Sequence, residues 1–262
     1  MIPNVIHYCW FSNEEMPPIV KKCIDSWRRY LPDYEFRLWD MKSIQDIDVP
    51  FLREALECRK WAFAADYVRL WAVEKYGGIY LDTDMELFKS LDEFRNCRAF
   101  IGREEIPNVY ENHPMTYLTS HVFGAEAHHP YVKDCKAYYE TRHFKITDNP
   151  RLPVVLRYDW RIAPEVSALV AINYGYNSYV KADYDQECSD GLMIYKSAIF
   201  SSSKRTSELV CRHYCLGSWR ARGECGLDAA PAPWWRKLLG RMGLSSSVER
   251  LMRRLGYAAY KL

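Results

Sequence analysis

Residues 61–84 place a helix, a sharp turn, a short buried strand and two carboxylates in direct succession, and this order limits what the chain can fold into. Helix-forming residues fill positions 61–76, and Gly77 suits the position just after a helix. The apolar residues 78–81 have the length and composition of a buried strand, and Asp82 and Asp84 follow it. Because α/β proteins bind ligands at the carboxyl ends of their strands, we expect an α/β fold with a site at these aspartates.

The spacing of the two aspartates is weak evidence by itself. The chain contains three Asp-x-Asp triplets, at residues 46–48, 82–84 and 183–185. The first runs into Val49-Pro50 and the third lies in a polar stretch, so both are typical of solvated turns. Only the triplet at 82–84 ends an apolar strand, where carboxylates can hold a hard divalent cation against a nucleotide diphosphate. A charged strand end without a ligand is the alternative for this pair.

Asp66 and Arg69 lie in the apolar part of the predicted helix over residues 61–76. They are three residues apart and so share one face of that helix. An ion pair of this kind on a protein surface contributes only a few tenths of a kcal/mol. Charge in an apolar helix is costly unless it has a task, which favours a functional role for the pair over a solvated ion pair.

Periodicity and turn residues predict alternating strands and helices along most of the chain. We expect strands near residues 2–10, 34–39, 78–82, 97–103, 115–123, 192–196 and 208–215. We expect helices near residues 18–30, 50–59, 61–76, 130–141 and 164–174. Such alternation indicates a mostly parallel sheet flanked by helices.

Three blocks of the sequence resemble one known family. The stretch 63–70 followed by 76–84 resembles the signature of the sugar-transferase group with the DXD motif, glycosyltransferase family 32, whose catalytic core is similar to that of the clostridial glucosylating toxins. Residues 2–11 resemble the opening strand of that family, and residues 211–219 resemble its closing His-x-x-x-x-Ser-Trp element. The resemblance covers roughly residues 2–220 and is weak over roughly 140–200.

The resemblance implies a GT-A-type fold, in which a Rossmann-like sheet binds a nucleotide-sugar donor beside an acceptor-binding half. Asp82 and Asp84 would then hold Mn²⁺ or Mg²⁺ on the donor diphosphate. His213 is a candidate third metal ligand, with a structural histidine as the alternative. Glu165 is a candidate acid/base near the acceptor, and the family retains the anomeric configuration.

The same resemblance implies donor contacts for five further side chains. Trp10 would stack on uracil, which favours a UDP-linked sugar, and a core tryptophan is the alternative. Asp66 and Arg69 would grip sugar and ribose hydroxyls in the catalytic site. Ser218 and Trp219 would close over the diphosphate and exclude water.

These features favour a metal-dependent, retaining glycosyltransferase, a hexosyltransferase that transfers a sugar to a saccharide acceptor in the synthesis of bacterial surface polysaccharide such as capsule. A metal-dependent phosphohydrolase is one alternative, because such enzymes also place Asp-x-Asp at a strand end. Met85 and Glu86 follow the triplet here and depart from that family's pattern. A non-catalytic protein that binds sugar or a membrane surface is the other alternative.

The charge distribution divides the chain into an acidic body and a basic tail. Residues 231–262 carry seven Lys or Arg against one Glu, which is +6, so the other residues carry 2 − 6 = −4. We expect a catalytic domain over 1–222, a Gly/Pro-containing linker over 223–233 and an amphipathic helical tail over 234–262. Basic residues beside Trp234 and Trp235 favour contact with an anionic membrane, where the acceptor would be lipid-linked. Helices packed on the core are the alternative.

Other features bear on location and partners. No apolar stretch approaches the roughly 18 residues of a membrane span, and a first strand from Ile2 leaves no room for a signal peptide. Nine cysteines without a Cys-x-x-Cys motif are typical of reduced thiols. We therefore expect a cytoplasmic protein, peripheral on the inner face of the cell membrane, and no nucleic-acid partner.

Overall fold

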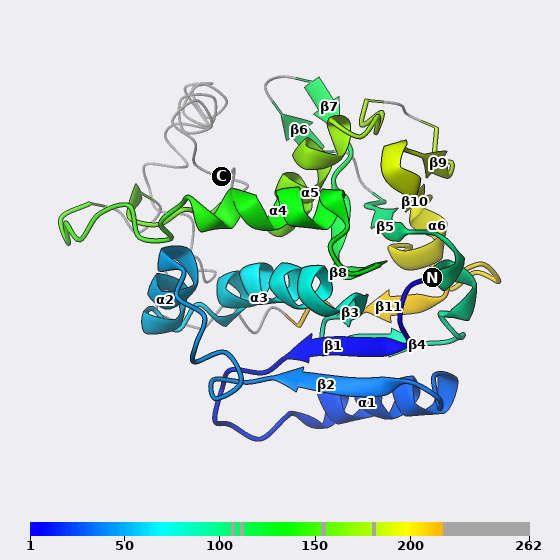
Figure 1. Cartoon of the computed structure of the whole chain (residues 1–262), viewed down its shortest axis with the longest axis horizontal. Coiled ribbons are helices and arrows are strands. Elements are labelled where there is room, and N and C mark those ends of the chain that lie inside the picture. The colour runs from blue at the N-terminus through cyan, green and yellow to red at the C-terminus, as the bar shows by residue number, and fades with distance from the viewer. Residues whose placement is uncertain (106–107, 111–112, 153–155, 180–181, 217–262) are drawn as a thin grey trace, which may run out of the picture.

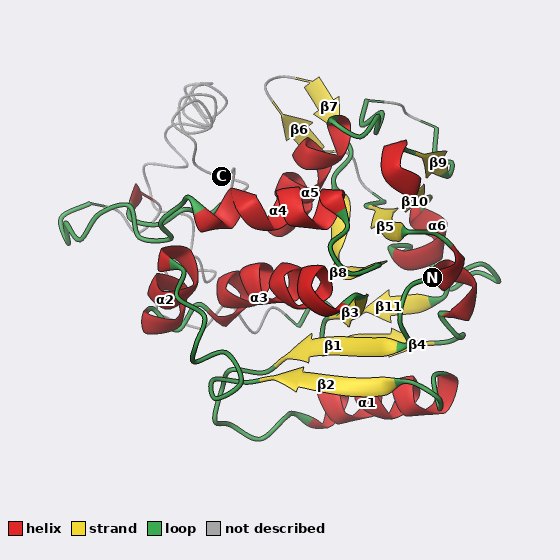
Figure 2. Cartoon of the chain, in the orientation of Figure 1, coloured by secondary structure: helices red, strands yellow, loops and turns green. Residues whose placement is uncertain are grey.

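A seven-stranded sheet forms the centre of the computed structural model, which describes residues 1–105, 108–110, 113–152, 156–179 and 182–216 (Figures 1 and 2). Its strand order is β2-β1-β3-β8-β5-β10-β9. The strands are β1 (Val5–Cys9), β2 (Glu35–Trp39), β3 (Gly78–Leu81), β5 (Ala99–Arg103), β8 (Leu118–Ala125), β9 (Gln186–Glu187) and β10 (Leu192–Tyr195).

Five of the seven strands point the same way. Strand β1 is parallel to β2 and β3, β10 is parallel to β5, and β8 runs antiparallel between β3 and β5. The edge strand β9 is antiparallel to β10. The prediction of an α/β fold with a mostly parallel sheet is therefore confirmed. The carboxyl ends of β1, β3, β5 and β10 meet at one edge of the sheet, and that edge carries the predicted aspartates.

Helices cover both faces of the sheet (Figure 2). They are α1 (Pro18–Tyr30), α2 (Pro50–Glu57), α3 (Trp61–Tyr76), α4 (Pro130–Glu140), α5 (Ala163–Ile172) and α6 (Ser197–Phe200), with 3-10 turns at η1 (Asp92–Asn96) and η3 (Ser189–Gly191). One hydrophobic core joins α2, α3, α4 and α5 to the sheet, and a second joins α1, η1 and α6 to its other face. Successive residues of β3 serve the two cores, with Tyr80 in the first and Ile79 and Leu81 in the second.

The turn between α3 and β3 requires its two glycines. Gly77 and Gly78 have φ of 65° and 105°, which L side chains rarely adopt. A Cβ on Gly77 would lie 2.8 Å from the Ala127 nitrogen, and one on Gly78 would lie 2.7 Å from the Val5 oxygen. This turn leaves only Gly77 between the end of α3 and the start of β3, and so fixes where the strand places Asp82.

Two small sheets complete the described residues. Strand β4 (Met85–Leu87) pairs with β11 (Cys211–His213), and β6 (Asn108–Tyr110) pairs with β7 (His113–Met115). The strand expected near 208–215 is thus shorter than predicted and joins β4 rather than the central sheet. The predicted linker and tail, from residue 223 onward, lie outside the described residues. None of the helices in the described ranges has the length and apolar character that a membrane crossing requires.

Candidate active site

Asp82, Asp84 and His213 each place one potential ligand atom within 4.8 Å of the others. Asp82 directly follows β3, and Asp84 directly precedes β4. The antiparallel pairing of β11 with β4 aligns His213 with Met85, the neighbour of Asp84. Residues more than a hundred positions apart in the chain therefore converge at the carboxyl edge of the sheet.

Asp82 is held in place by contacts with β8, with β3 and with α3. Its backbone N–H donates to the His121 carbonyl of β8 at 2.9 Å, which extends the β3–β8 pairing by one residue. The Tyr80 hydroxyl donates to Asp82 Oδ1 at 2.8 Å, and Arg69 Nη2 lies 3.4 Å from the same oxygen. Both contacts engage Oδ1, so the protein fixes the direction in which the carboxylate points.

Arg69 is a buried link between Asp66 and Asp82. Its Nη2 lies 3.0 Å from Asp66 Oδ1, and its guanidinium lies over the Tyr80 ring. Its Nε and Nη1 donate to the backbone carbonyls of Ala65 and Ser120. Burial raises the pKa of Asp66 to about 7, although the Arg69 charge opposes this shift. Asp66 and Arg69, which were predicted to grip donor hydroxyls, are thus buried, and Arg69 contacts Asp82. Their direct contact with a donor stays a prediction.

Asp84 is fixed mainly by the segment that follows β11. Its Oδ2 accepts from the Leu216 backbone N–H at 2.9 Å, and its carbonyl accepts from the Tyr214 N–H at 3.1 Å. His213 Nε2 lies 3.2 Å from Asp84 Oδ1. Burial by itself would raise the pKa of Asp84, but the hydrogen bond with His213 outweighs it and the pKa is lowered.

His213 is held as a charged partner of Asp84 in the absence of a metal. Burial alone would lower the pKa of its imidazole, but hydrogen bonds with Asp84 and Cys215 raise it to about 10. A cation that binds Nε2 must therefore displace a proton from this nitrogen. Two carboxylates and one imidazole supply the hard oxygen and nitrogen ligands that Mn²⁺ accepts, so these residues fit the implied metal.

Several residues of the site lacked a local signal in the sequence. The His121 ring packs 4.5 Å from the His213 ring, and its Nε2 lies 3.3 Å from the Phe200 carbonyl. Burial lowers the pKa of His121 well below its usual value, which favours a neutral ring. Because a carbonyl can only accept, the contact with Phe200 places the proton of that ring on Nε2. Glu104, at the end of β5, accepts from the Ser201 hydroxyl, and burial raises its pKa. Only the pairing of distant strands brings these residues to the site.

The other predicted site residues differ in how closely they approach this group. Trp10 follows β1 at the same sheet edge, is partly buried, and donates from Nε1 to the Glu14 carbonyl. Glu165 is 5% exposed, with its oxygens 3.2 Å from Arg161 Nε and from the Tyr117 hydroxyl. It does not belong to the metal-ligand group described above. Ser218 and Trp219 lie outside the described residues.

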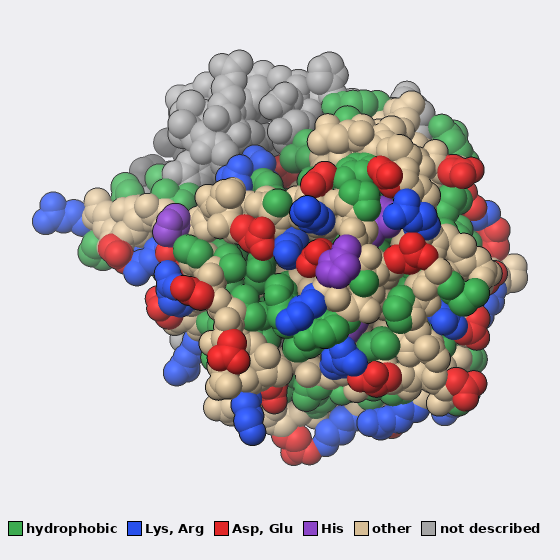
Figure 3. All heavy atoms as spheres, in the orientation of Figure 1, with side chains coloured by type: hydrophobic (Ala, Val, Ile, Leu, Met, Phe, Trp, Pro, Cys, Tyr) green, Lys and Arg blue, Asp and Glu red, His purple; other side chains and the backbone are tan. Residues whose placement is uncertain are grey.

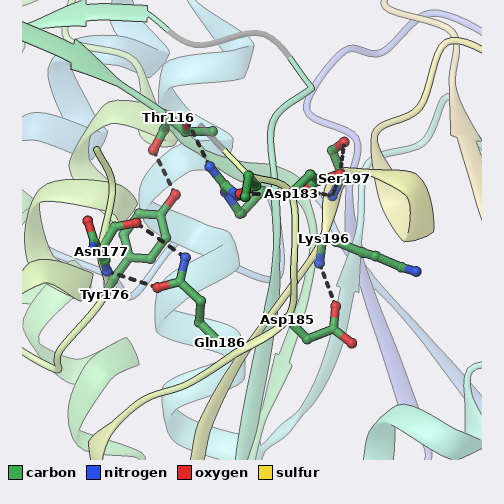
Figure 4. A network of polar contacts seen from close by, with 10 residues as sticks. Thr116, Tyr176, Asn177, Asp183, Asp185, Gln186, Lys196 and Ser197 are labelled. Atoms are coloured by element: carbon green, nitrogen blue, oxygen red, sulfur yellow. Dashed lines mark hydrogen bonds and ion pairs between the residues drawn. The ribbon is translucent and has the colours of Figure 1, made fainter. Parts of the chain in front are cut away.

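The Asp183 triplet has a structural task that its sequence context did not indicate (Figure 4). Asp183 accepts from the Ser197 backbone N–H and hydroxyl at the start of α6, and Arg103 Nη1 lies 3.6 Å from it. Asp185 accepts from the Lys196 N–H. Both aspartates are exposed, as expected for a turn, but they also anchor this turn to α6. Asp46 is exposed and is the better neutral comparison for Asp82.

Residues 17–101 match the family model of the glycosyltransferase sugar-binding region containing the DXD motif. The match covers about a third of the chain, from α1 to β5, and includes Asp66, Arg69, Asp82 and Asp84. Trp10 and His213 lie outside it.

Curated proteins similar to this chain match about half of its residues. Inositol phosphoceramide mannosyltransferase 3 of Schizosaccharomyces pombe is 33% identical over 129 residues, which are 47% of this chain and 35% of the relative. The uncharacterized glycosyltransferase L373 of Acanthamoeba polyphaga mimivirus is 31% identical over 136 residues, which are 50% and 52% of the two chains. The chain therefore spans about a third to a half of the length of these relatives.

Solved structures give weaker likenesses. The PaToxG glycosyltransferase has a TM-score of 0.44 at 16% identity and covers 66% of this chain and 69% of its own. A glycosyltransferase involved in the glycosylation of the major capsid of PBCV-1 has a TM-score of 0.41 at 12% identity and covers 75% and 83%.

Proposed function

We propose that this chain is a metal-dependent, retaining glycosyltransferase that moves a hexosyl group from a nucleotide sugar to a saccharide acceptor. The observation that carries the proposal is the convergence of Asp82, Asp84 and His213 at the carboxyl edge of β3. Asp82 and Asp84 also lie within residues 17–101, the part that matches a DXD sugar-binding region. A UDP-linked donor is the first candidate, with Trp10 stacked on its base.

In this proposal, Asp82, Asp84 and His213 hold Mn²⁺ or Mg²⁺. The bound cation supplies charge neutralisation for the departing diphosphate. Tyr80 and Arg69 orient the Asp82 carboxylate, and the Arg69 guanidinium adds positive charge beneath it. The backbone N–H of Leu216 fixes the Asp84 carboxylate. Both carboxylate oxygens of Glu165 already contact protein groups, Arg161 and Tyr117, which argues against Glu165 as the base. We therefore favour front-face transfer, in which the leaving phosphate oxygen takes the acceptor proton.

The acceptor and the location are further parts of the proposal. Relatives named as inositol phosphoceramide mannosyltransferases support a mannosyl donor group and a lipid-linked acceptor. Synthesis of bacterial surface polysaccharide on a lipid-linked saccharide is the second candidate role. Either acceptor would be reached by a cytoplasmic protein bound to the inner membrane face through its basic tail.

The experiment measures release of nucleotide diphosphate from a panel of UDP- and GDP-linked sugars, with and without Mn²⁺. We expect Asp82→Asn and Asp84→Asn each to lower turnover by on the order of 10²-fold or more, because each removes a charged ligand. EDTA should abolish turnover reversibly, and Asp46→Asn should retain it, with circular dichroism as the test of folding.

Turnover that survives EDTA and either substitution would contradict a metal-dependent transfer. Release of inorganic phosphate alone would favour the phosphohydrolase alternative. Nucleotide-sugar binding without turnover across the whole panel would favour a non-catalytic binder.

A further inference from the structure

The two nitrogens of the His213 ring face different partners. Nε2 lies 3.2 Å from Asp84 Oδ1 on the side of the candidate metal group. Nδ1 lies 3.4 Å from the sulfur of Cys215, two residues further along the chain. The ring also packs 4.5 Å from the buried ring of His121. His213 is therefore contacted at both ends and on one face.

Cys215 reaches this position through an unusual backbone conformation. Its φ is 50°, in the left-handed region that few non-glycine residues adopt. Both of its neighbours are anchored to Asp84, Tyr214 through the Asp84 carbonyl and Leu216 through the Asp84 carboxylate. The turn brings the thiol back over β11, where Sγ also lies 3.9 Å from the His213 carbonyl. Because both sequence neighbours of Cys215 are hydrogen-bonded to Asp84 and its own backbone is left-handed, we infer that its side chain has a role at this position.

We propose that Cys215 is a positioning residue that orients His213 toward the divalent cation, an inference that rests on the metal site of the proposed function. With Nε2 directed to the cation, Nδ1 carries the ring proton and donates it in a hydrogen bond to Sγ. Metal-binding histidines usually donate this second N–H to a carboxylate, a carbonyl or water. Here a thiol takes that place and fixes both the tautomer and the rotation of the ring.

The geometry separates this role from direct ligation by sulfur. The thiol lies at the Nδ1 end of the imidazole, whereas Asp84 lies at the Nε2 end. Across the described residues, the cluster of candidate ligand atoms within 4.8 Å of one another contains Asp82, Asp84 and His213 without Cys215. The sulfur therefore acts through the histidine rather than on the cation.

The experiment titrates Mn²⁺ into the full chain and follows free Mn²⁺ by electron paramagnetic resonance. We expect Cys215→Ala to weaken Mn²⁺ binding by about 10- to 100-fold, the usual cost of losing such a partner. Cys215→Ser keeps a hydrogen-bonding side chain and should recover part of the affinity. Cys97→Ala is the matched control, because Cys97 is a partly exposed thiol with one hydrogen bond, to the Phe94 carbonyl, and lies outside the candidate metal group.

A second readout distinguishes positioning of the histidine from general loosening of the fold. Electron spin-echo modulation from an imidazole nitrogen at bound Mn²⁺ should be present in the wild type and in Cys97→Ala, and reduced in Cys215→Ala. Thermal unfolding of the metal-free variants should differ little from the wild type.

Unchanged Mn²⁺ affinity and nitrogen modulation in Cys215→Ala would overturn the inference and leave the proposed function standing. Equal loss in Cys97→Ala would overturn it as well. A wild-type chain that binds no Mn²⁺ would overturn both proposals. Normal Mn²⁺ binding with a Cys215 effect, but no turnover of any nucleotide sugar, would overturn the proposed function alone.

Discussion

The Tyr80 hydroxyl donates to Asp82 Oδ1 from a ring that is 1% exposed, and Arg69 lies over that ring. Asp82 therefore depends on two buried side chains, one from α3 and one from β3. Asp84 depends on different groups, the Leu216 N–H and His213, which arrive from the far end of the described chain. The two carboxylates of one triplet are thus positioned independently of each other.

Tyr80→Phe tests the first of these supports. The variant keeps the buried ring and removes the hydrogen bond to Asp82, so we expect Mn²⁺ affinity to fall by about tenfold or more. Stability should change by only about 1–2 kcal/mol. Mn²⁺ titration and urea unfolding measure the two effects. Tyr67→Phe is the control, because its hydroxyl bonds Glu140 instead. Equal Mn²⁺ affinity in the two variants would contradict the assigned role.

Trp10→Ala tests whether the partly buried indole stacks on the donor base. We expect UDP binding to weaken by on the order of 1–3 kcal/mol, and UDP to quench Trp10 fluorescence in the wild type. Isothermal calorimetry with UDP and GDP measures the change. A preference for GDP, or equal UDP affinity in the variant, would return Trp10 to a packing role.

At the scale of elements, His7 joins β1 to β2 and to the turn between α3 and β3. The side chain is fully buried, its Nε2 lies 2.8 Å from the Gly77 carbonyl, and Nδ1 accepts from the Trp39 indole N–H. Because Nδ1 accepts, the ring must be neutral with its proton on Nε2. The histidine thus anchors the glycine turn that delivers β3 and Asp82 to the sheet edge.

The burial of His7 predicts a loss of stability in acid. Burial lowers the pKa of His7 to about 4, although the Gly77 hydrogen bond opposes this shift. Above pH 6.5 the ring is neutral in both states and has no effect. Between pH 6.5 and 4 the unfolded chain takes up a proton that the folded chain does not, so stability falls as pH falls. A shift of this size corresponds to about 3 kcal/mol.

Urea unfolding across this pH range, with EDTA present, measures the effect. His7→Gln cannot titrate, so its stability deficit relative to the wild type should shrink by up to about 3 kcal/mol between pH 6.5 and 4. His143→Gln, at a site whose side chain is 65% exposed, is the control. A deficit for His7→Gln that stays constant with pH would show that the ring accepts a proton in the folded state.

At the scale of the whole molecule, the sheet edge that carries the candidate site belongs to the described residues, and the predicted tail does not. On the face shown in Figure 3, acidic and basic side chains are interspersed rather than gathered by sign. The excess positive charge of the sequence lies instead in residues 231–262. Any electrostatic attraction to an anionic membrane would therefore come chiefly from that segment.

Liposome co-sedimentation of the full chain tests the tail. We expect partition into anionic vesicles at low salt, with about 1 kcal/mol from each basic residue near the surface. A triple variant, Arg250→Gln, Arg253→Gln and Arg254→Gln, should partition markedly less, and high salt should weaken both chains. The variant Arg28→Gln, in the exposed last turn of α1, is the matched control. Equal partition of the triple variant and the wild type would reject the membrane contact.

Local sequence signals were sufficient for the segment from α3 to Asp84. Helix α3 has the predicted bounds, and β3 follows at the double glycine, because helix propensity, left-handed glycines and an apolar run act within a few residues. The order of strands and helices in most of the chain followed from the same kind of signal. These features depend on neighbours in sequence, and a single sequence contains them.

Tertiary structure decided how the site is assembled. The pairing of β11 with β4 brings His213 to Asp84, and the β3–β8 pairing brings His121 to both. The buried Arg69 contacts Asp82, and the turn after β11 places the Cys215 sulfur beside His213 Nδ1. Each contact joins residues whose partners are chosen by sheet pairing and core packing across the whole chain. Periodicity within one segment contains no information about such long-range pairings. The sequence therefore predicted Asp66, Arg69, Asp82, Asp84 and His213 as site residues, and the tertiary structure decided which of them contact one another.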